Sequence, residues 1–237
     1  MQTLSIIIPC YNEEDGIPQL ADQLTPVIAQ LTDYTVELIF IDDGSTDKTN
    51  ELLHMYFPSA TILKHEKNQN LGAALRTGFK HANGDLIAAL DSDCTYHPSV
   101  LPKLIQMLDN ETHIVTVSPY HPQGKVENVP AYRLFLSKSV SMIYRILLKS
   151  NLHTYTAMVR VYKKQIVKNI EIKSNTFMGV TEILVKALLY GYNAKEIPVT
   201  LTARKFGISK LKTVRAIRDH LKLIKSLVAY RVWGSKI

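Results

Sequence analysis

Short apolar runs, each followed by polar or acidic residues, constrain the fold of this chain more strongly than any other feature of its sequence. Residues 4–9, 36–41 and 86–90 are apolar except for Ser5 and Glu37, and such runs without regular alternation are typical of strands buried on both faces of a sheet. Segments with helical spacing separate these runs. This alternation predicts an α/β fold with a mostly parallel sheet, right-handed crossovers and flanking helices.

The rest of the chain extends this pattern, and no linker-like segment divides it. We expect helices at residues 16–31, 48–57, 73–82, 98–108, 132–148, 180–189 and 214–233. We expect further strands at residues 61–65, 114–117, 154–162 and 194–202. No Gly-x-Gly-x-x-Gly motif follows the first strand, which argues against a dinucleotide site of the usual kind.

Two aspartates follow the apolar run at residues 86–90. Asp91 and Asp93 stand two positions apart, so on an extended segment their carboxylates point the same way. Convergent acids at the carboxyl edge of an α/β sheet suit a divalent metal ion. Taken alone, Asp91-Ser92-Asp93 could equally form a polar turn after a strand.

The composition describes a globular protein, with 46% hydrophobic and 21% charged residues among 237. Cys10 and Cys94 give no disulfide framework. The first residues lack the features of a signal peptide, and no window of about 18 residues is uninterruptedly apolar. These features predict a cytoplasmic protein without a transmembrane helix.

Positive charge is concentrated near the C-terminus. Residues 201–237 contain ten Lys or Arg residues and one acid, Asp219. This bias suits a partner that bears phosphates, such as a nucleotide, an anionic membrane surface or a nucleic acid. A helical stripe of apolar residues runs beside Arg215, Arg218, Lys222 and Lys225; its members are Val214, Ile217, Leu221, Ile224 and Val228. Such a helix could lie on a membrane or pack on its own domain with a solvated basic face.

Five motifs occur in order over the first hundred residues. They are Pro-Cys-Tyr-Asn-Glu at 9–13, Asp-Asp-Gly-Ser-Thr-Asp at 42–47, Asn-Leu-Gly at 70–72 with Gly78, Ala-Asn-Gly-Asp at 82–85 and Asp-Ser-Asp at 91–93. Together they resemble the family 2 glycosyltransferases, which have the GT-A (Rossmann-like) fold. The resemblance implies a GT-A catalytic domain over residues 1–212 and a basic amphipathic C-terminal helix over 213–237.

Later segments resemble one branch of that family, the dolichol-phosphate mannose synthase-like polyprenyl-phosphate glycosyltransferases. The segments are Arg-Val-Tyr at 160–162, Glu182 in its helix, Gly-Tyr at 191–192 and Arg-Lys-Phe-Gly-Ile-Ser-Lys-Leu at 204–211. The branch implies a nucleotide-diphosphate sugar donor, Mg²⁺ or Mn²⁺, and a polyprenyl phosphate acceptor. No nucleic acid is expected as a partner.

The resemblance assigns roles to residues at the matching positions. The nucleotide pocket would contain Pro9, Tyr11 and Glu13, with Asp42 or Asp43 receiving donors from the base or ribose. The diphosphate and its metal would lie at Asp91, Ser92 and Asp93, with Thr95 as a further metal ligand. Phosphates would be held by Arg133, Arg204 and Lys210. The catalytic residues would be Asp93, Arg204 and Lys210.

The acceptor is less constrained. A hydroxyl acceptor usually needs a general base, whereas a lipid phosphate is already anionic. Hydroxyl-using relatives commonly carry an acidic pair before the late helix, but residues 179–182 contain the single acid Glu182. Glu182 could serve as a base or favour the helix N-terminus. Two further differences affect this region: Pro119 replaces an Arg of the branch, for which Lys125 or Arg133 could compensate, and Thr156-Ala157-Met158-Val159 replaces a Thr-Gly-Gly-Phe segment.

The leading hypothesis is a metal-dependent, inverting enzyme that moves a hexose from a nucleotide-diphosphate sugar to a polyprenyl phosphate at the cytoplasmic membrane face. The chain would reach that acceptor peripherally, through an anionic membrane surface or a membrane partner protein. A second hypothesis replaces the acceptor by a sugar or small-molecule hydroxyl. A third is a non-catalytic GT-A scaffold that binds nucleotide or membrane.

Overall fold

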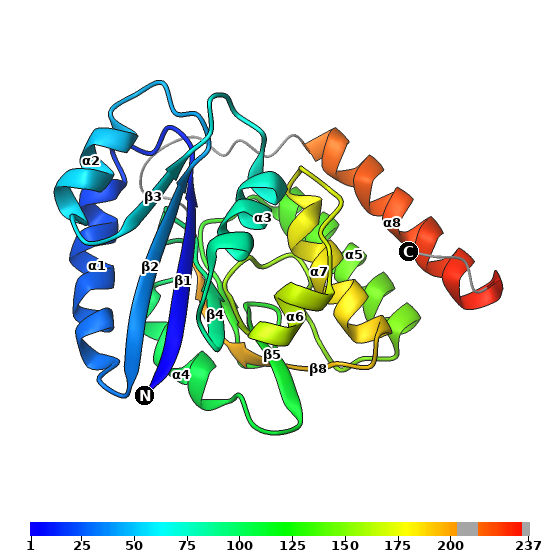
Figure 1. The fold of residues 1–237 in the computed structure, drawn as a ribbon. Helices are drawn as coiled ribbons and strands as arrows, with labels where there is room; N and C mark the ends of the chain where they lie inside the picture. The colour runs from blue at the N-terminus through cyan, green and yellow to red at the C-terminus, as the bar shows by residue number, and fades with distance from the viewer. Residues whose placement is uncertain (203–212, 234–237) are drawn as a thin grey trace.

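The structure is a computed structural model that describes residues 1–202 and 213–233, and it confirms a mixed α/β fold with helices on both faces of a central sheet (Figure 1). The strand order of that seven-stranded sheet is β3-β2-β1-β4-β7-β5-β8. Its strands are β1 (Gln2–Cys10), β2 (Tyr34–Asp42), β3 (Thr61–Lys64), β4 (Leu86–Ala89), β5 (Thr112–Ser118), β7 (Arg160–Lys163) and β8 (Asn193–Pro198). Strands β6 (Lys125–Val126) and β9 (Thr200–Leu201) pair separately.

The helices form two layers. One layer, with a hydrophobic core of its own, contains α1 (Ile17–Gln30), α2 (Thr49–Tyr56) and α4 (Leu101–Gln106), which follows the 3₁₀ turn η1 (Pro98–Val100). The other packs on the opposite sheet face and contains α3 (Leu71–His81), α5 (Ala131–Leu148), α6 (Lys164–Asn169), α7 (Met178–Leu189) and α8 (Thr213–Trp233).

Strand β1 shows why its apolar run does not alternate. Ile6 and Ile8 point into the core beneath α1, whereas Ile7 points into the core beneath α3, and all three are fully buried. Helix α3 can approach β1 closely because it presents Gly78, where a Cβ atom would overlap the Ile7 side chain. The apolar residues of β1 therefore contribute to the hydrophobic cores on both faces of the sheet.

Strand direction decides where the polar segments meet. Strands β2 and β4 both pair parallel with β1, and β3 pairs parallel with β2. The carboxyl ends of these strands consequently share one edge of the sheet. Strand β7 runs antiparallel between β4 and β5. The sequence prediction of a mostly parallel sheet is confirmed, with β7 as the reversed strand.

Two predicted strands are wrong in part. The strand expected at 154–162 is limited to Arg160–Lys163. The buried Arg160 side chain donates a hydrogen bond to the Tyr155 carbonyl oxygen (Nη2 to O, 2.6 Å), which holds the preceding segment in an irregular path. The strand expected at 194–202 breaks after Pro198, and its second part, β9, pairs with the short strand β6 instead of β5. Helix α6 was not predicted.

Helix α8 packs on its own domain, but only partly through the stripe that helical spacing indicated, of which Ile224 packs against the core. Leu223 and Leu227 are buried against the layer of α5 and α7. By contrast, Val214 is 82% exposed and Leu221 is 61% exposed. The helix thus has one apolar face in the core and a second that faces solvent. Across the described ranges, the structure contains no helix with the length and apolar character of a membrane span.

Candidate active site

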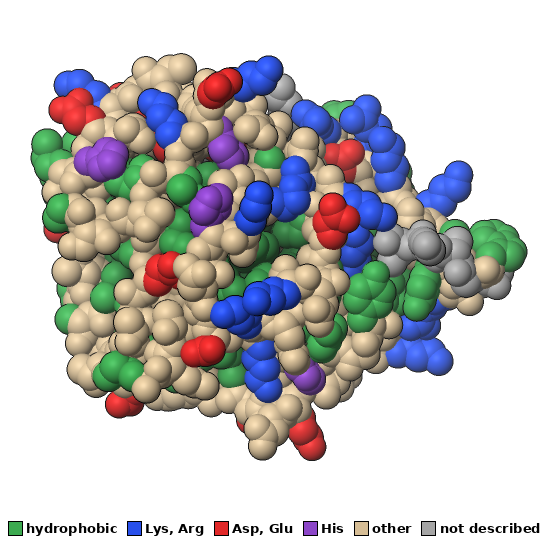
Figure 2. Space-filling model, viewed as in Figure 1, with side chains coloured by type: hydrophobic (Ala, Val, Ile, Leu, Met, Phe, Trp, Pro, Cys, Tyr) green, Lys and Arg blue, Asp and Glu red, His purple; other side chains and the backbone are tan. Residues whose placement is uncertain are grey.

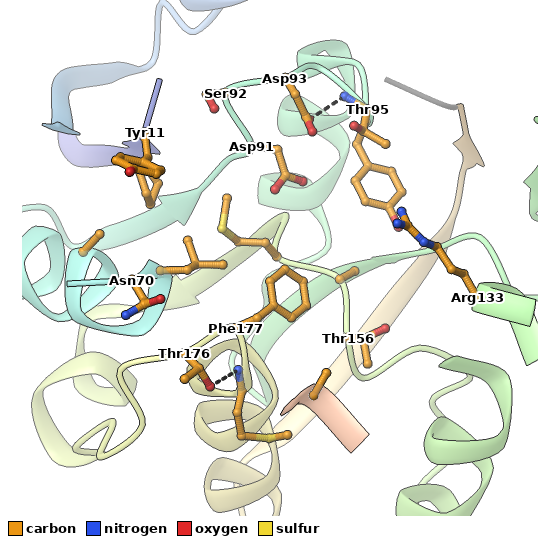
Figure 3. Close-up of a pocket in the computed structure, with 18 of the residues that line it drawn as sticks. Tyr11, Asn70, Asp91, Ser92, Asp93, Thr95, Arg133, Thr156, Thr176 and Phe177 are labelled. Carbon is orange, nitrogen blue, oxygen red and sulfur yellow. Dashed lines mark hydrogen bonds between the residues drawn. The ribbon is translucent and has the colours of Figure 1, made fainter. Parts of the chain in front are cut away.

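A cavity of about 830 Å³ opens at the carboxyl edge of the sheet (Figure 3). One side is formed by residues that follow β1, β2 and β4, together with the start of α3; we call it the strand-end wall. The other side is formed by residues 128–133, 156–158, 176–178 and the first two turns of α8; we call it the helix wall. The close-up shows Tyr11, Asp91 and Asp93 on the first side and Thr156, Thr176 and Phe177 on the second.

The loops after β1 and β2 hold one another in place. The Asn12 backbone N–H donates to Ser45 Oγ (3.0 Å), and the Thr46 N–H donates to Asn12 Oδ1 (2.9 Å). Asn12 adopts a positive φ of 51°, a conformation that Asn tolerates better than most residues. These contacts fix the positions of Tyr11 and Glu13, and both residues line the cavity as the sequence predicted, together with Pro9.

The structure separates the two candidate aspartates after β2. Asp42 is fully buried, accepts a hydrogen bond from the Ser45 N–H at Oδ1 (2.8 Å) and does not line the cavity. Asp43 lines the cavity, and its Oδ1 contacts His65 Nδ1 (2.6 Å) and accepts from the Gln69 N–H (2.9 Å). Asp43 is therefore the acid that can reach a ligand, and Asp42 stabilises the turn.

The turn after β4 brings Asp91, Ser92, Asp93 and Thr95 into the same cavity. Asp93 Oδ1 accepts a hydrogen bond from the Thr95 N–H (3.0 Å), which shapes the turn (Figure 3). The Thr95 hydroxyl is buried and has no hydrogen-bond partner among the described residues. A buried hydroxyl without a partner costs free energy, so this oxygen is available to bind a ligand or metal ion that enters the cavity.

The pKa of the Cys94 thiol reflects the negative charge of this turn. Burial, together with the Asp93 and Asp91 carboxylates, raises the pKa of its thiol to about 12. The thiol therefore stays protonated at neutral pH, which favours a packed side chain over a nucleophile. The same negative potential would be relieved by a bound cation.

The residues present fit a divalent metal ion of the Mg²⁺ or Mn²⁺ type. Asp91 and Asp93 supply carboxylates, and Thr95 supplies the hydroxyl without a partner. Across residues 1–202 and 213–233, no group of three or more His, Cys, Asp or Glu side chains could hold a metal. Mg²⁺ commonly takes one or two carboxylates and completes its shell with substrate phosphates and water, so this small donor set suits it.

The helix wall contains residues that the sequence did not single out. Thr176 donates its hydroxyl to Asp219 Oδ2 of α8 (3.1 Å), so the segment before α7 is tied to the C-terminal helix. Phe177, Asp219 and His220 line the cavity beside it. No sequence signal identified these residues, because they come from two segments that meet only in the folded chain.

His220 is held neutral in this wall. Burial lowers the pKa of its imidazole to about 4, an effect that the neighbouring Asp219 carboxylate only partly opposes. Its Nδ1 lies 3.1 Å from the hydroxyl of Tyr144 on α5. Because a neutral imidazole adds no charge, we do not count His220 among the cations of the cavity.

Glu182 lies outside the cavity lining. A general base was one of the two roles that the sequence left open for this residue. It is 5% exposed, and its Oε1 forms a salt bridge with Lys186 Nζ (2.6 Å). Its carboxylate also accepts the backbone N–H groups of Lys173 (3.0 Å) and Ser174 (2.8 Å). All of these contacts are structural, so Glu182 anchors the segment that leads to Thr176.

The predicted basic residues fall into three groups. Arg133 of α5 lines the cavity, and in the close-up it points towards the side where Thr95 lies (Figure 3). Arg204 and Lys210 lie outside the described residues. Lys125 is exposed on β6 and does not line the cavity, and neither does the buried Pro119. Of the two compensating residues proposed from the sequence, Arg133 is the one that the cavity contains.

Comparison with known proteins identifies the family. The model of Glycosyl transferase family 2 matches residues 5–171. Dolichol-phosphate mannosyltransferase of Pyrococcus furiosus is 32% identical over 234 residues, which cover 96% of this chain and 64% of that protein. This chain therefore spans a little less than two thirds of that relative. Polyprenol monophosphomannose synthase of Mycolicibacterium smegmatis is 29% identical over 220 residues, covering 89% of this chain and 81% of the relative.

Solved structures agree in fold. Glucosyl-3-phosphoglycerate synthase from Mycobacterium tuberculosis, in complex with Mn²⁺, UDP and glucosyl-3-phosphoglycerate, superimposes with a TM-score of 0.70 at 18% identity and covers 97% of this chain and 80% of that one. The same enzyme with Mg²⁺ and UDP gives a TM-score of 0.70 at 17% identity, covering 97% and 79%. These similarities show a GT-A fold. The family match over residues 5–171 establishes that the chain belongs to glycosyl transferase family 2.

Proposed function

We propose that the chain is a metal-dependent, inverting glycosyltransferase that moves a hexose from a nucleotide-diphosphate sugar to a polyprenyl phosphate. One observation carries the proposal: the acids that follow β1, β2 and β4 share a single cavity with the Thr95 hydroxyl, which has no hydrogen-bond partner among the described residues, and the opposite wall of that cavity includes an apolar part. The names of the Pyrococcus and Mycolicibacterium relatives support the lipid phosphate as the acceptor.

The strand-end wall is suited to the donor. Asp43 is held by His65 and can accept hydrogen bonds from the base or ribose, while Pro9 and Tyr11 offer apolar surface to the ring. Asp91, Asp93 and Thr95 would hold Mg²⁺ or Mn²⁺ beside the diphosphate. When bound, the metal would neutralise the charge that develops on the leaving diphosphate. Arg133, and the Arg204 and Lys210 of the sequence motif, are proposed to bind phosphate oxygens.

Inversion follows from a single displacement. The acceptor oxygen attacks the anomeric carbon from the face opposite the diphosphate, and the bond to the diphosphate breaks with both electrons leaving on its oxygen. A phosphate acceptor needs no proton removed before it attacks. The structural contacts of Glu182, which take it out of the cavity, favour this acceptor over a hydroxyl.

The apolar part of the helix wall is suited to a prenyl chain. Its apolar members are Val129, Pro130, Ala157, Met158, Phe177, Met178 and Ala216. These side chains cannot donate hydrogen bonds, so they offer little to a sugar acceptor and favour a hydrocarbon. Ala157 and Met158, which depart from the family pattern, belong to this apolar part.

We further propose that the chain reaches its acceptor as a peripheral protein at an anionic membrane surface on the cytoplasmic face. Helices α5 and α8 pack together and both expose apolar side chains, among them Phe135 at 71%, Ile146 at 65% and Leu221 at 61%. Exposed Lys138, Arg145, Lys222 and Lys225 accompany them. Lys and Arg side chains gather along α8 in the space-filling view (Figure 2). Apolar insertion combined with basic charge is the usual basis of interfacial binding.

The activity is tested by a donor screen. The protein is incubated with UDP-, GDP- or dTDP-hexoses and Mg²⁺ or Mn²⁺, with and without polyprenyl phosphate, and release of the nucleoside diphosphate is measured. We expect one donor to be cleaved, with strong stimulation by the lipid and loss of activity in EDTA. Equal release with and without the lipid would contradict the acceptor, and full activity in EDTA would contradict the metal.

Membrane attachment needs point variants, because deletion of α8 would remove the buried Leu223 and Leu227 and uncover the core that they pack against. Leu221→Ser should weaken binding to anionic vesicles several-fold in co-sedimentation, since it removes an exposed apolar contact. Met55→Ser on α2 is the matched control, as Met55 is also exposed, at 62%, but lies on the opposite helical layer. Equal loss of binding in both variants would contradict the proposed surface.

A further inference from the structure

Among the described residues that line the cavity, carboxylates outnumber cations. Among the described lining residues, five carry carboxylates: Glu13, Asp43, Asp91, Asp93 and Asp219. The described cations in the lining are Arg133 and Arg215. An acceptor that carries a phosphate must approach these carboxylates, so it needs a cation on its own side of the cavity.

Arg215 occupies the helix wall, on the first turn of α8. It belongs to the helix wall with Thr176 and Phe177, whereas Asp91 and Asp93 belong to the strand-end wall. Asp219, one turn further along α8, accepts from the Thr176 hydroxyl (3.1 Å) and lies 3.8 Å from Arg218 Nε. Arg215 itself makes no hydrogen bond or ion pair with another described residue. Its guanidinium is therefore free to bind an anion that enters the cavity.

The neighbours of Arg215 connect this position with the exposed apolar surface of α8. Val214 is 82% exposed and Ile217 is 40% exposed, and they stand on either side of Arg215 in the sequence. A phosphate held at Arg215 would leave an attached hydrocarbon chain beside these side chains. Arg218, also on α8, differs from Arg215 in that it does not line the cavity and its side chain is 64% exposed.

From this arrangement we propose that Arg215 binds the phosphate monoester of the acceptor, so that α8 contributes a specificity residue to the active site. The inference rests on the proposed function and deepens it. A guanidinium presents two parallel N–H donors to phosphate oxygens, which gives both charge and orientation. Arg133 of α5 would contact the same group or the donor diphosphate from a second helix.

The test compares Arg215→Ala with Arg218→Ala in the full chain. Two acceptors are used: a long polyprenyl phosphate in phosphatidylcholine vesicles, and a short, water-soluble prenyl phosphate that needs no membrane. With both acceptors we expect Arg215→Ala to raise the acceptor KM by about 10- to 100-fold, the range of a lost hydrogen bond to a charged group. The donor KM and the acceptor-independent donor hydrolysis should change little. Arg218→Ala should behave as the wild type with the soluble acceptor.

Two further measurements separate the outcomes. Arg215→Lys should recover part of the acceptor KM, because it restores the charge but not the paired donors. Inorganic phosphate should compete with the acceptor in the wild type and less effectively in Arg215→Ala. An unchanged acceptor KM in an active Arg215→Ala enzyme, or an equal defect in Arg218→Ala, would overturn this inference alone. Failure of the wild type to transfer to either acceptor would overturn the proposed function as well.

Discussion

The strand-end wall and the helix wall meet in one cavity but are built in different ways. Residues of the strand-end wall follow parallel strands, and backbone N–H groups hold their side chains, such as the Thr95 N–H on Asp93 and the Gln69 N–H on Asp43. The helix wall is assembled from irregular segments and two helices that are held by side chains, such as Thr176 on Asp219 and Arg160 on Tyr155. The placement of the first wall therefore follows from the sheet, and that of the second follows from side-chain contacts between segments outside the sheet edge.

This difference fits a division of labour. A nucleotide-diphosphate donor presents the same groups to every enzyme that uses it, so a rigid strand-end wall is suited to bind it. An acceptor differs from one enzyme to another, and irregular segments can change without disturbing the sheet. Changes in the strand-end wall should therefore affect chemistry, whereas changes in the helix wall should affect acceptor use and local stability.

The largest effect is expected at the strand-end wall. Asp93→Asn removes a carboxylate from the proposed metal site while keeping the side-chain shape, so transfer should fall by about 10²- to 10³-fold. Steady-state kinetics with the preferred donor measure the change, and circular dichroism verifies the fold. Asp33→Asn, in an exposed turn before β2, is the control and should retain activity. Full activity of Asp93→Asn would remove the residue from the site.

The buried pair behind the helix wall should matter for stability and not for the chemical step. Glu182→Gln leaves Lys186, which is 3% exposed, without its carboxylate partner, so the free energy of unfolding should fall by about 3 kcal/mol. Urea denaturation measures this loss, and kcat of the folded variant should stay within about tenfold of the wild type because Glu182 is not a base here. A folded variant with about a thousandfold lower kcat would instead restore the base assignment.

The contact between the two walls can be disturbed at Gly72, in the first turn of α3. A Cβ atom there would overlap the Ser174 carbonyl oxygen and lie 2.8 Å from the Thr176 carbonyl oxygen. Gly72→Ala should thus displace the segment that leads to Phe177 and cost about 2 kcal/mol of unfolding free energy. In Gly16→Ala the nearest atom, the Glu13 carbonyl oxygen, would be at 3.5 Å, so this control should be nearly neutral. Equal stability of both variants would show that the segment adapts without cost.

The smallest effect is a pH dependence of stability from His220. Its folded pKa is about 4 against an ordinary value of 6.5, so below pH 6.5 the unfolded chain takes up a proton that the folded chain does not. Stability is therefore lost as pH falls from 6.5 towards 4, by about 1.5 kcal/mol between pH 6.5 and about pH 5. Tyr144 and Asp219 are the groups that face the ring.

Urea denaturation of His220→Gln at both pH values measures this contribution. The variant should lose less stability on acidification than the wild type, since it lacks the group that titrates. His54→Gln, at an exposed position on α2, should follow the wild type. The same loss in His220→Gln and the wild type would show that the acid sensitivity originates elsewhere.

The sequence predicted the strand-end wall well because its placement follows from strand direction. Once β1, β2 and β4 are parallel, the residues after them must share one edge, and Asp43, Asp91 and Asp93 do so. Local spacing could not decide between Asp42 and Asp43, because that choice depends on which side chain the turn buries. The contacts of His65 and Gln69 with Asp43 settle it in the folded chain.

The helix wall was predicted poorly for a physical reason. Residues 154–159 have the composition of a strand, but Arg160 and Ser141 take up the backbone groups of Tyr155 that a strand would pair. On α8, apolar residues recur at helical spacing on two faces, and periodicity alone cannot tell which face packs. Leu227 is buried while Val228 next to it is exposed. Only the positions of α5 and α7 determine this choice.

The most direct test of the central claim is transfer of a radiolabelled hexose into the organic phase. The wild-type chain is incubated with the labelled nucleotide sugar, polyprenyl phosphate and Mg²⁺ or Mn²⁺, and the lipid is extracted and counted. The account predicts label in the lipid that depends on the metal and is lost in Asp93→Asn. Label that remains in the aqueous phase under every metal and donor, with folded protein, would contradict the account.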